Sequence, residues 1–324
     1  MNEIWISRYE LRPLTVLSAR AAKAPRAGAL LRVGHGFADL HPWPELGDKP
    51  LDEQLTLLAS GTTTPSTRAS LLLAEADGEA RAIGKSLFHG LTIPVSHYLR
   101  LSSEGEIDIE ELARQGFERI KVKAGKDLDS ERVWITKVLS KIEATHATLK
   151  MRIDFNAAVT RFQLESFLAF IPQGLRGHID FLEDPLPYDP DTWQELRDVY
   201  GVRLAADFEK PSETFRGIDT LVIKPARENV AAQMEMAAAH DLRVVVTSSL
   251  DHPVGLMGAA FAAAGLQRDR PDLLDACGLL SHTSYQRDAF SERIAMDGPH
   301  LNPPSGTGIG FDDLLAALPW ERLK

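Results

Sequence analysis

The chain has 324 residues, of which 44% are hydrophobic and 25% charged, and its formal net charge is −10. This composition supports a sizeable buried core and argues against wholesale disorder, nucleic-acid binding and binding to anionic membranes. Cys277 is the only cysteine, which excludes an intramolecular disulfide and a thiolate metal cluster. No apolar run is long enough to span a bilayer and the N-terminus lacks a secretory pattern, so we expect a cytoplasmic protein.

Residues 1–95 predict a small α+β unit. A mixed aromatic, β-branched and charged pattern over residues 4–16 predicts a strand at the edge of a sheet, and residues 30–34 predict a second strand. The prolines and glycines of residues 36–48 exclude regular helix there. Helices are predicted over residues 51–60 and 66–87. Such a unit is too small to be stable alone, so we expect it to pack on the rest of the chain.

Short apolar segments then alternate with helical patterns over residues 96–298. Repeated βα units imply parallel strands, and eight of them predict a (β/α) barrel of the TIM type. Residues 299–324 are expected to return to the N-terminal unit. An open doubly wound sheet is the alternative, but no glycine-rich phosphate fingerprint follows any strand. The strand candidates are residues 97–101, 119–123, 151–155, 179–183, 203–207, 220–224, 243–247 and 273–277.

An ionisable residue ends each of five successive strand candidates. These residues are Lys123, Asp154, Glu183, Asp207 and Lys224. The carboxyl ends of parallel barrel strands converge on one face, where active sites are built. Burying such charges together is costly unless they pair or bind a metal. A solvated strand end explains any one of these positions, but it explains five in register poorly.

The two-residue periodicity of a strand extends this set. Lys121 shares a face with Lys123, and Arg152 and Asn156 share a face with Asp154. The acidic residues offer oxygen ligands only, which favours magnesium over zinc. The sequence therefore predicts a divalent-cation site beside a pair of lysines at the mouth of a barrel.

Five motifs in this order resemble the enolase superfamily, and within it the o-succinylbenzoate synthases of menaquinone biosynthesis. The motifs are Lys121-Val122-Lys123, Arg152-Ile153-Asp154-Phe155-Asn156, Phe181-Leu182-Glu183-Asp184-Pro185, Asp207, and Val222-Ile223-Lys224-Pro225. The resemblance covers most of the chain, with the N-terminal unit corresponding to the capping domain of that superfamily. Residues 36–39 lack the Gly-x-Gly-Glu pattern usual in that domain.

The resemblance implies a role for each matched position. Lys123 would be the catalytic base, Lys224 the lysine on the opposite face of the substrate, and Lys121 the neighbour that tunes Lys123. Mg²⁺, for which Mn²⁺ can substitute, would be held by Asp154, Glu183 and Asp207. The small-molecule carboxylate substrate would be bound by Arg152, Asn156, Ser248 and Ser249. Phe208 follows Asp207 where the superfamily commonly has Glu, so Glu209 is an alternative third ligand.

The reaction that the resemblance implies is a magnesium-dependent syn dehydration. Lys123 would take the α proton of 2-succinyl-6-hydroxy-2,4-cyclohexadiene-1-carboxylate, forming an enediolate, and would return the proton to the departing hydroxyl. Free lysine has a pKa of about 10.4. Like-charge crowding by Lys121 would therefore be needed to favour the neutral amine of Lys123.

Other functions stay open at this point. An N-succinylamino acid racemase or a dipeptide epimerase of the same superfamily would use Lys123 and Lys224 as paired bases. The epimerase would need an acidic residue at the end of the eighth strand, where Asp275 is a candidate. A non-catalytic binding barrel is a third alternative. Trp43, between two prolines, is expected to be either a specificity residue or an anchor for its loop, and the oligomeric state is left undetermined.

Overall fold

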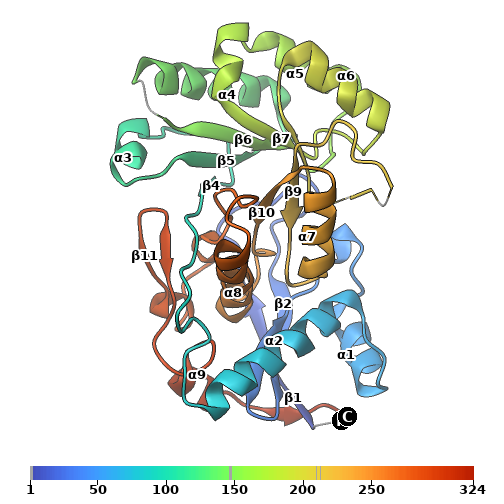
Figure 1. Cartoon of the computed structure of the whole chain (residues 1–324), viewed down its shortest axis with the longest axis vertical. Helices are drawn as coiled ribbons and strands as arrows, with labels where there is room; N and C mark the ends of the chain where they lie inside the picture. The colour runs from blue at the N-terminus through green and yellow to red at the C-terminus, as the bar shows by residue number, and fades with distance from the viewer. Residues whose placement is uncertain (1–2, 146–147, 209, 212) are drawn as a thin grey trace.

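The computed structural model describes residues 3–324 except 146–147, 209 and 212. It contains an antiparallel sheet, drawn at the bottom of Figure 1, and a larger parallel sheet, drawn above it. The strands are β1 Ile4–Leu11, β2 Arg26–Val33, β3 Gly36–Leu40, β4 Tyr98–Arg100, β5 Arg119–Lys123, β6 Lys150–Asp154, β7 Ile179–Glu183, β8 Leu204–Ala206, β9 Thr220–Ile223, β10 Arg243–Val246, β11 Ala295–Asp297, β12 His300–Asn302 and β13 Glu321–Arg322. The α-helices are α1 Leu51–Ala59, α2 Pro65–Ala82, α3 Ile109–Arg114, α4 Leu128–Ala144, α5 Arg161–Phe170, α6 Pro190–Tyr200, α7 Val230–Ala239, α8 Pro253–Asp269 and α9 Asp312–Ala316. Short 3-10 helices cover Pro44–Leu46, Gln173–His178, Ser281–Ser284 and Ser291–Arg293.

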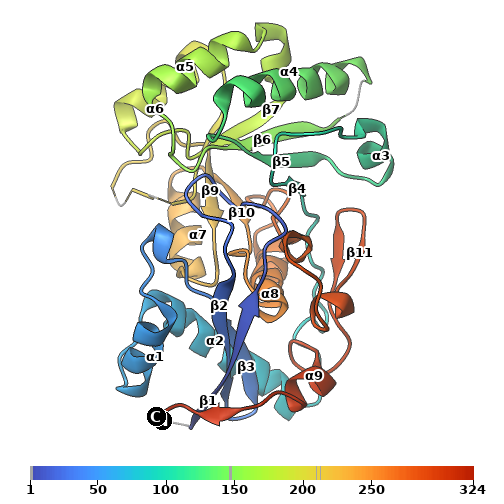
Figure 2. The ribbon, with the colours of Figure 1, turned by 180° about the vertical axis from the view of Figure 1, so that it is seen from behind.

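The antiparallel sheet has the strand order β13-β1-β2-β3. β1 is therefore an inner strand and not the predicted edge strand, because Trp5 pairs with Arg322 near the C-terminus. The prediction also overlooked β3, which ends just before the prolines that exclude helix. Helix α2 lies against β3 and β2 (Figures 1 and 2). This close packing requires Gly36, since a Cβ there would lie 1.7 Å from the Ala74 carbonyl oxygen.

The parallel sheet has the order β10-β9-β8-β7-β6-β5-β4, so strands that are consecutive in sequence are neighbours in space. Helices α4, α5 and α6 lie along the side of β5 to β7 that faces the top of Figure 1, and α7 and α8 lie beside β9 and β10. Side chains alternate along each strand as predicted: Ile120 and Val122 belong to the main apolar core, whereas Phe181 and Val222 belong to a small separate cluster.

The eighth strand candidate is not a regular strand, but its backbone joins the two edges of the parallel sheet. Leu274 forms a parallel bridge to Val244 of β10, Gly278 forms one to Thr247 just after β10, and Cys277 bridges Ser96, just before β4. Arginine side chains bind carbonyl groups that a regular ladder would use: Arg243 Nη2 donates to the Leu274 oxygen at 3.0 Å, and Arg152 Nη1 donates to the Ala276 oxygen at 2.6 Å. The predicted α/β class is confirmed, and the fold is TIM-like.

The C-terminal segment leaves the parallel sheet and crosses to the antiparallel one. After the β11–β12 hairpin, Ile309 N donates to Asp77 of α2, and β13 then pairs with β1. Helix α9 lies between these two contacts (Figure 2). No helix in the described part of the chain combines the length and apolar character needed to cross a membrane.

The thiol of Cys277 gives a test of the joining segment. The side chain is fully buried, and burial raises the pKa of the thiol to about 12, compared with about 8.5 for a free cysteine. Because the pKa of the thiol is higher in the folded state, burial of the protonated thiol stabilises the fold fully below about pH 8.5. This stabilisation is lost as pH rises from there toward 12. Maleimide labelling at pH 8 is expected to be negligible in the native protein and complete in urea. Rapid labelling of the native protein would contradict the buried position.

Candidate active site

The carboxyl ends of the parallel strands bring the predicted charged residues together. Lys123 of β5 is the register partner of Asp154 in β6, and Asp154 is the register partner of Glu183 in β7. Asp207 and Lys224 follow directly after β8 and β9. Asp154 and Glu183 are at most 1% exposed, so the strands carry these carboxylates into the interior and not to a solvated rim.

Lysine ammonium groups neutralise the three buried carboxylates. Lys123 Nζ lies 2.5 Å from Asp154 Oδ2, and Lys121 Nζ lies 3.0 Å from the same oxygen. Lys121 Nζ also lies 2.6 Å from Glu183 Oε2. On the other side, Lys224 pairs with Asp207. Isolated buried charges are strongly unfavourable, so this mutual pairing is what allows the cluster to exist.

The pKa shifts follow from burial and from this pairing. Burial opposes the charged form of Asp154, but Lys121 and Lys123 outweigh it and hold the pKa of that carboxyl well below its usual range. Glu183 shows the opposite balance, since burial and neighbouring Asp154 raise its pKa to about 8. Burial also opposes the charge on Lys121 and Lys224, yet the carboxylates dominate and raise both pKa values. The expected crowding of Lys123 by Lys121 is therefore accompanied by carboxylates that attract both ammonium groups.

The predicted ligands do not form a ready-made metal cluster. Among the described residues, no three acidic, histidine or cysteine side chains are placed to share one ion. The carboxylates are nevertheless neighbours, because Asp154 and Glu183 both contact Lys121 Nζ. Asp207 Oδ1 is buried and has no hydrogen-bond partner in the described structure. The donor set is all oxygen, so it fits a hard cation once the ammonium groups are displaced. Glu209, the alternative ligand, lies outside the described residues.

A cavity of about 70 Å³ opens onto this cluster. Its lining includes most of the predicted residues: Lys121, Lys123, Asn156, Asp207, Lys224, Ser248 and Ser249. Several buried polar atoms there have no partner in the described structure, namely Asn156 Oδ1, Asp207 Oδ1, Thr247 Oγ1 and Ser249 Oγ. Because unpaired buried polar atoms are rare and costly, their convergence on one cavity is typical of a ligand site.

Arg152 is the predicted substrate-binding residue that does not line this cavity. Its side chain is fully buried, and its Nε donates to Asp180 Oδ2 at 2.8 Å. Its Nη1 binds the Ala276 carbonyl and lies 3.2 Å from His97 Nδ1. The geometry therefore favours a supporting role over contact with substrate. Strand periodicity gave the correct face for Arg152, but its position one pleat further from the strand end puts it in the layer below the cavity.

Two residues of this region were not singled out from the sequence. Asp184 follows Glu183, has φ = 42° and accepts hydrogen bonds from the backbone N–H groups of Asp207 and Phe208 at 2.9 and 3.1 Å. His97 lines the cavity, and burial followed by the charge of Arg152 holds its pKa well below the usual value. The acidic pair Glu183-Asp184 was visible in the sequence, whereas nothing local distinguished His97.

Asp275, the candidate for an epimerase-type ammonium ligand, lies at the opposite end of the sheet. Its Oδ1 accepts from Arg243 Nη2 at 2.6 Å, and Arg243 begins β10. Asp275 lines a surface depression together with Asp219, which comes just before β9. The residues of this segment that line the active-site cavity are Gly278 and Ser281, which carry no charge.

Comparisons with known proteins identify relatives of this chain in sequence and in fold. Residues 4–80 match the family model described as the N-terminal domain of O-succinylbenzoate synthase. The whole chain is 36% identical over 338 aligned positions to an o-succinylbenzoate synthase from Bdellovibrio bacteriovorus, covering 100% of this chain and 99% of that protein. The fold is similar to that of an L-Ala-D/L-Glu epimerase from Bacillus subtilis, with a TM-score of 0.75, 17% identity and coverage of 96% and 98%. It also resembles a dipeptide epimerase from Enterococcus faecalis complexed with Mg and dipeptide, with a TM-score of 0.72, 14% identity and coverage of 96% and 99%.

Asp184→Ala tests whether the Asp184 carboxylate holds the backbone at Asp207, the third predicted metal ligand. The substitution leaves two backbone N–H groups without acceptors and puts alanine at a positive φ, so we expect a loss of about 1–3 kcal/mol in the free energy of unfolding. Urea denaturation of the variant gives this value directly. Asp198→Ala, at an exposed position of α6, is the control and should unfold at the wild-type urea concentration. Equal stability of the two variants would contradict the role assigned to Asp184.

Proposed function

This chain belongs to the o-succinylbenzoate synthase family, and from that membership we propose that it is a magnesium-dependent hydro-lyase. It removes water from 2-succinyl-6-hydroxy-2,4-cyclohexadiene-1-carboxylate to form o-succinylbenzoate, a step of menaquinone biosynthesis. The single observation that carries the proposal is the cavity lined by Lys121 and Lys123 on one side and Lys224 on the other, above buried carboxylates. A cytoplasmic location remains a prediction.

Asp154, Glu183 and Asp207 would hold the magnesium ion. Oxygen donors and the unpartnered Asp207 Oδ1 support this assignment. When bound, the cation supplies a Lewis acid that stabilises negative charge on the substrate carboxylate. A carboxylate that binds the cation no longer holds a lysine ammonium as tightly. Lys123 then keeps Lys121 as a close cationic neighbour while its pairing with Asp154 weakens, which favours the neutral amine that a base needs.

The lysines have different roles on the two faces of the substrate. Lys123 removes the α proton and delivers it to the departing hydroxyl on the same face, which is a syn elimination. Lys224 faces the cavity from the other side of the curled sheet, because β9 is separated from β5 by three strands. Its pairing with Asp207 favours the ammonium form, which can stabilise the delocalised ring anion by a cation–π contact.

Ser248 and Ser249 follow β10 and would receive the succinyl carboxylate. Ser248 Oγ lies 2.5 Å from Ser281 Oγ, and Ser249 Oγ has no partner in the described structure. Asn156, whose Oδ1 is also unpartnered, would bind substrate near the lysine pair. We further propose that residues 1–95, with the returning tail 299–324, act as an α+β capping domain on a barrel formed by residues 96–298. The pairing of β13 with β1 supports that division.

Lys123→Ala is expected to lower kcat by about 10²–10⁴-fold, which is the typical contribution of a general base. Turnover of the cyclohexadiene carboxylate, followed by ultraviolet absorbance in the presence of Mg²⁺, measures this. Lys137→Ala, on helix α4, is the control and should retain wild-type turnover. Full activity of the Lys123 variant would rule out its role as the base.

Removal of divalent ions with a chelator should abolish turnover, and Mg²⁺ or Mn²⁺ should restore it. The same measurement with N-succinylamino acids and dipeptides separates the alternatives within the superfamily. Racemisation without dehydration would reassign the protein to the N-succinylamino acid racemases. The position of Asp275 far from the cavity makes epimerisation of dipeptides with a free ammonium group the least expected result.

A further inference from the structure

The segment from Thr247 to His252 carries Ser248 and Ser249. Residues outside the parallel sheet make several of the hydrogen bonds that hold this segment in place. Trp43, between β3 and α1, donates from Nε1 to the Ser249 carbonyl oxygen at 2.7 Å. Asp39 of β3 accepts from the His252 backbone N–H at 3.1 Å. β3 and the loop that follows it therefore contact the segment at two points, one on each side of Leu250.

The indole of Trp43 is itself held rigidly. Trp43 is only 3% exposed, and the Arg26 guanidinium lies 3.6 Å from the centre of its ring system. Arg26 in turn makes two hydrogen bonds to Glu45, at 2.8 and 3.0 Å. Cation–π stacking and a bidentate pair fix the ring plane. The indole N–H is thus a pre-oriented donor to Ser249.

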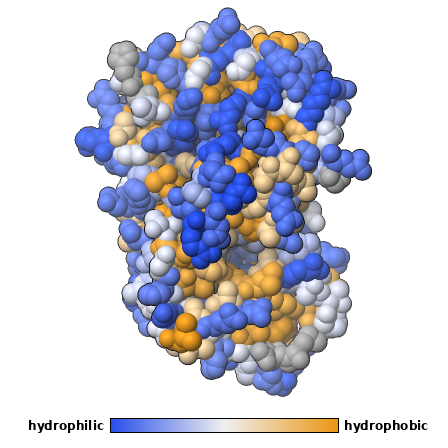
Figure 3. Space-filling view, in the orientation of Figure 1, coloured by the Kyte–Doolittle hydropathy of each residue, from blue (hydrophilic) through white to orange (hydrophobic). Residues whose placement is uncertain are grey.

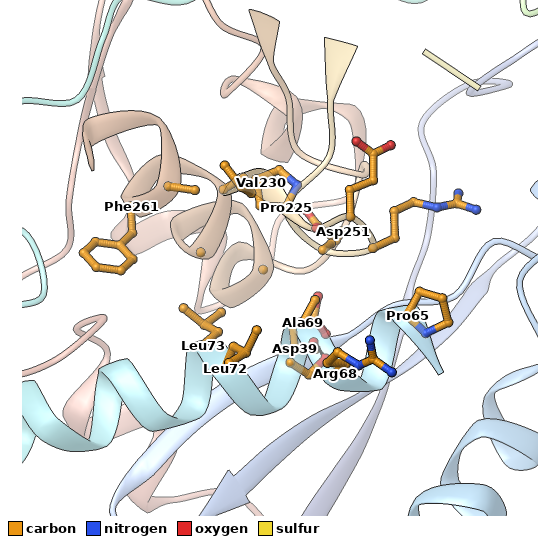
Figure 4. A pocket seen from close by; sticks show the side chains of 18 of the residues that line it. Asp39, Pro65, Arg68, Ala69, Leu72, Leu73, Pro225, Val230, Asp251 and Phe261 are labelled. Carbon is orange, nitrogen blue, oxygen red and sulfur yellow. Dashed lines mark hydrogen bonds between the residues drawn. The ribbon is translucent and has the colours of Figure 1, made fainter. Parts of the chain in front are cut away.

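The other end of the segment is fixed by buried carboxyl groups. Tyr9 Oη donates to Asp39 Oδ1 at 2.6 Å, and Asp251 Oδ2 accepts from Ser249 N at 3.4 Å. Both carboxylates approach helix α8 at Gly255, where a Cβ would lie 2.5 Å from Asp39 Oδ2 and 2.9 Å from Asp251 Oδ2. They also line a pocket between α2, α7 and α8, visible as a hollow in Figure 3 and close up in Figure 4.

Leu250, between these anchors, has φ = 52°, a conformation that costs a non-glycine residue free energy. The Tyr285 hydroxyl donates to its carbonyl oxygen. A backbone in this conformation persists only where its surroundings hold it. The contacts from Trp43, Asp39 and Tyr285 therefore keep the segment in the form that turns Ser249 toward the cavity.

We propose that Trp43 is a positioning residue for the recognition of the substrate's second carboxylate, and that it acts through Ser249. This inference rests on the proposed function and deepens it: Trp43 does not participate in proton transfer, but sets the Ser249 backbone and hydroxyl where the succinyl chain ends. Trp43 also lines the cavity. The sequence led us to expect that Trp43 is either a loop anchor or a specificity residue. In this proposal it has both roles.

The test compares Trp43→Phe with Trp320→Phe in the magnesium-loaded protein. Both substitutions keep an aromatic ring and delete an indole N–H that donates to a backbone carbonyl, since Trp320 Nε1 binds the Leu315 oxygen at 2.9 Å near the C-terminus. We expect Trp43→Phe to raise KM roughly threefold to tenfold, the equivalent of one hydrogen bond, with kcat within about twofold of wild type. Trp320→Phe is expected to leave both constants unchanged.

A second readout separates positioning of Ser249 from a general loss of structure. Inhibition by o-succinylbenzoate, which carries the second carboxylate, is expected to weaken with KM in Trp43→Phe, whereas inhibition by benzoate, which lacks it, stays at the wild-type value. Equal weakening for both ligands, or no weakening for either, overturns the inference. If Trp43→Phe does not fold, Tyr285→Phe takes its place, because it removes the donor to Leu250 and carries the same expectation.

The proposed function is tested separately by the wild-type protein in the same assay. Turnover by wild type together with unchanged constants in Trp43→Phe refutes only the positioning role. A wild-type protein that neither dehydrates the cyclohexadiene carboxylate nor binds o-succinylbenzoate refutes the proposed function and the positioning role with it.

Discussion

The structure depends on the mutual neutralisation of buried lysines and carboxylates at the carboxyl ends of its parallel strands. None of these groups is tolerable alone in the interior, since removing one partner of a buried pair costs about 3–5 kcal/mol. Lys121 contacts both Asp154 and Glu183, so the strands β5, β6 and β7 must be in register for these three charges to be satisfied. The same register delivers the lysine pair and the acids to one cavity. The register of the strands therefore both satisfies the buried charges and arranges the residues of the candidate active site.

A second group of charged residues lies below the first, and its role is to hold the parallel sheet together. Asp180 Oδ2 accepts from Arg152 at 2.8 Å and from Arg119 at 3.1 Å, near the amino ends of the strands. Arg152 also binds the Ala276 carbonyl, and Arg243 binds the Leu274 carbonyl. These arginines tie the irregular segment that joins β10 to the start of β4. The upper layer therefore faces the cavity, whereas the lower layer holds the sheet in its curled form.

The fold is shared with epimerases at less than 20% identity, so it does not by itself select a reaction. The uncharged residues at the rim of the cavity are the ones that we expect to select the substrate. The segment after β10 carries two serines, and the segment after the eighth strand position contributes Gly278 and Ser281, where an ammonium-binding site would need an acid. Their hydroxyl groups can donate hydrogen bonds to a carboxylate. β3 and the loop that follows it hold the segment after β10, and they add no charged group to the lining of the cavity.

The sequence by itself determined the α/β class, most of the strand positions and the charged residues that meet at the cavity. It could do so because strand periodicity and strand-end position depend only on local order along the chain. Lys123, Asp154, Glu183, Asp207 and Lys224 could all be named in this way. The inner position of β1 could not, because it depends on pairing with residues more than 300 positions away in sequence. The layer occupied by Arg152, the side of the sheet on which Asp275 lies and the contact of Trp43 with Ser249 were likewise decided only by the tertiary structure. Each depends on which partner lies within hydrogen-bonding distance across the fold, and no local pattern of residues encodes that distance.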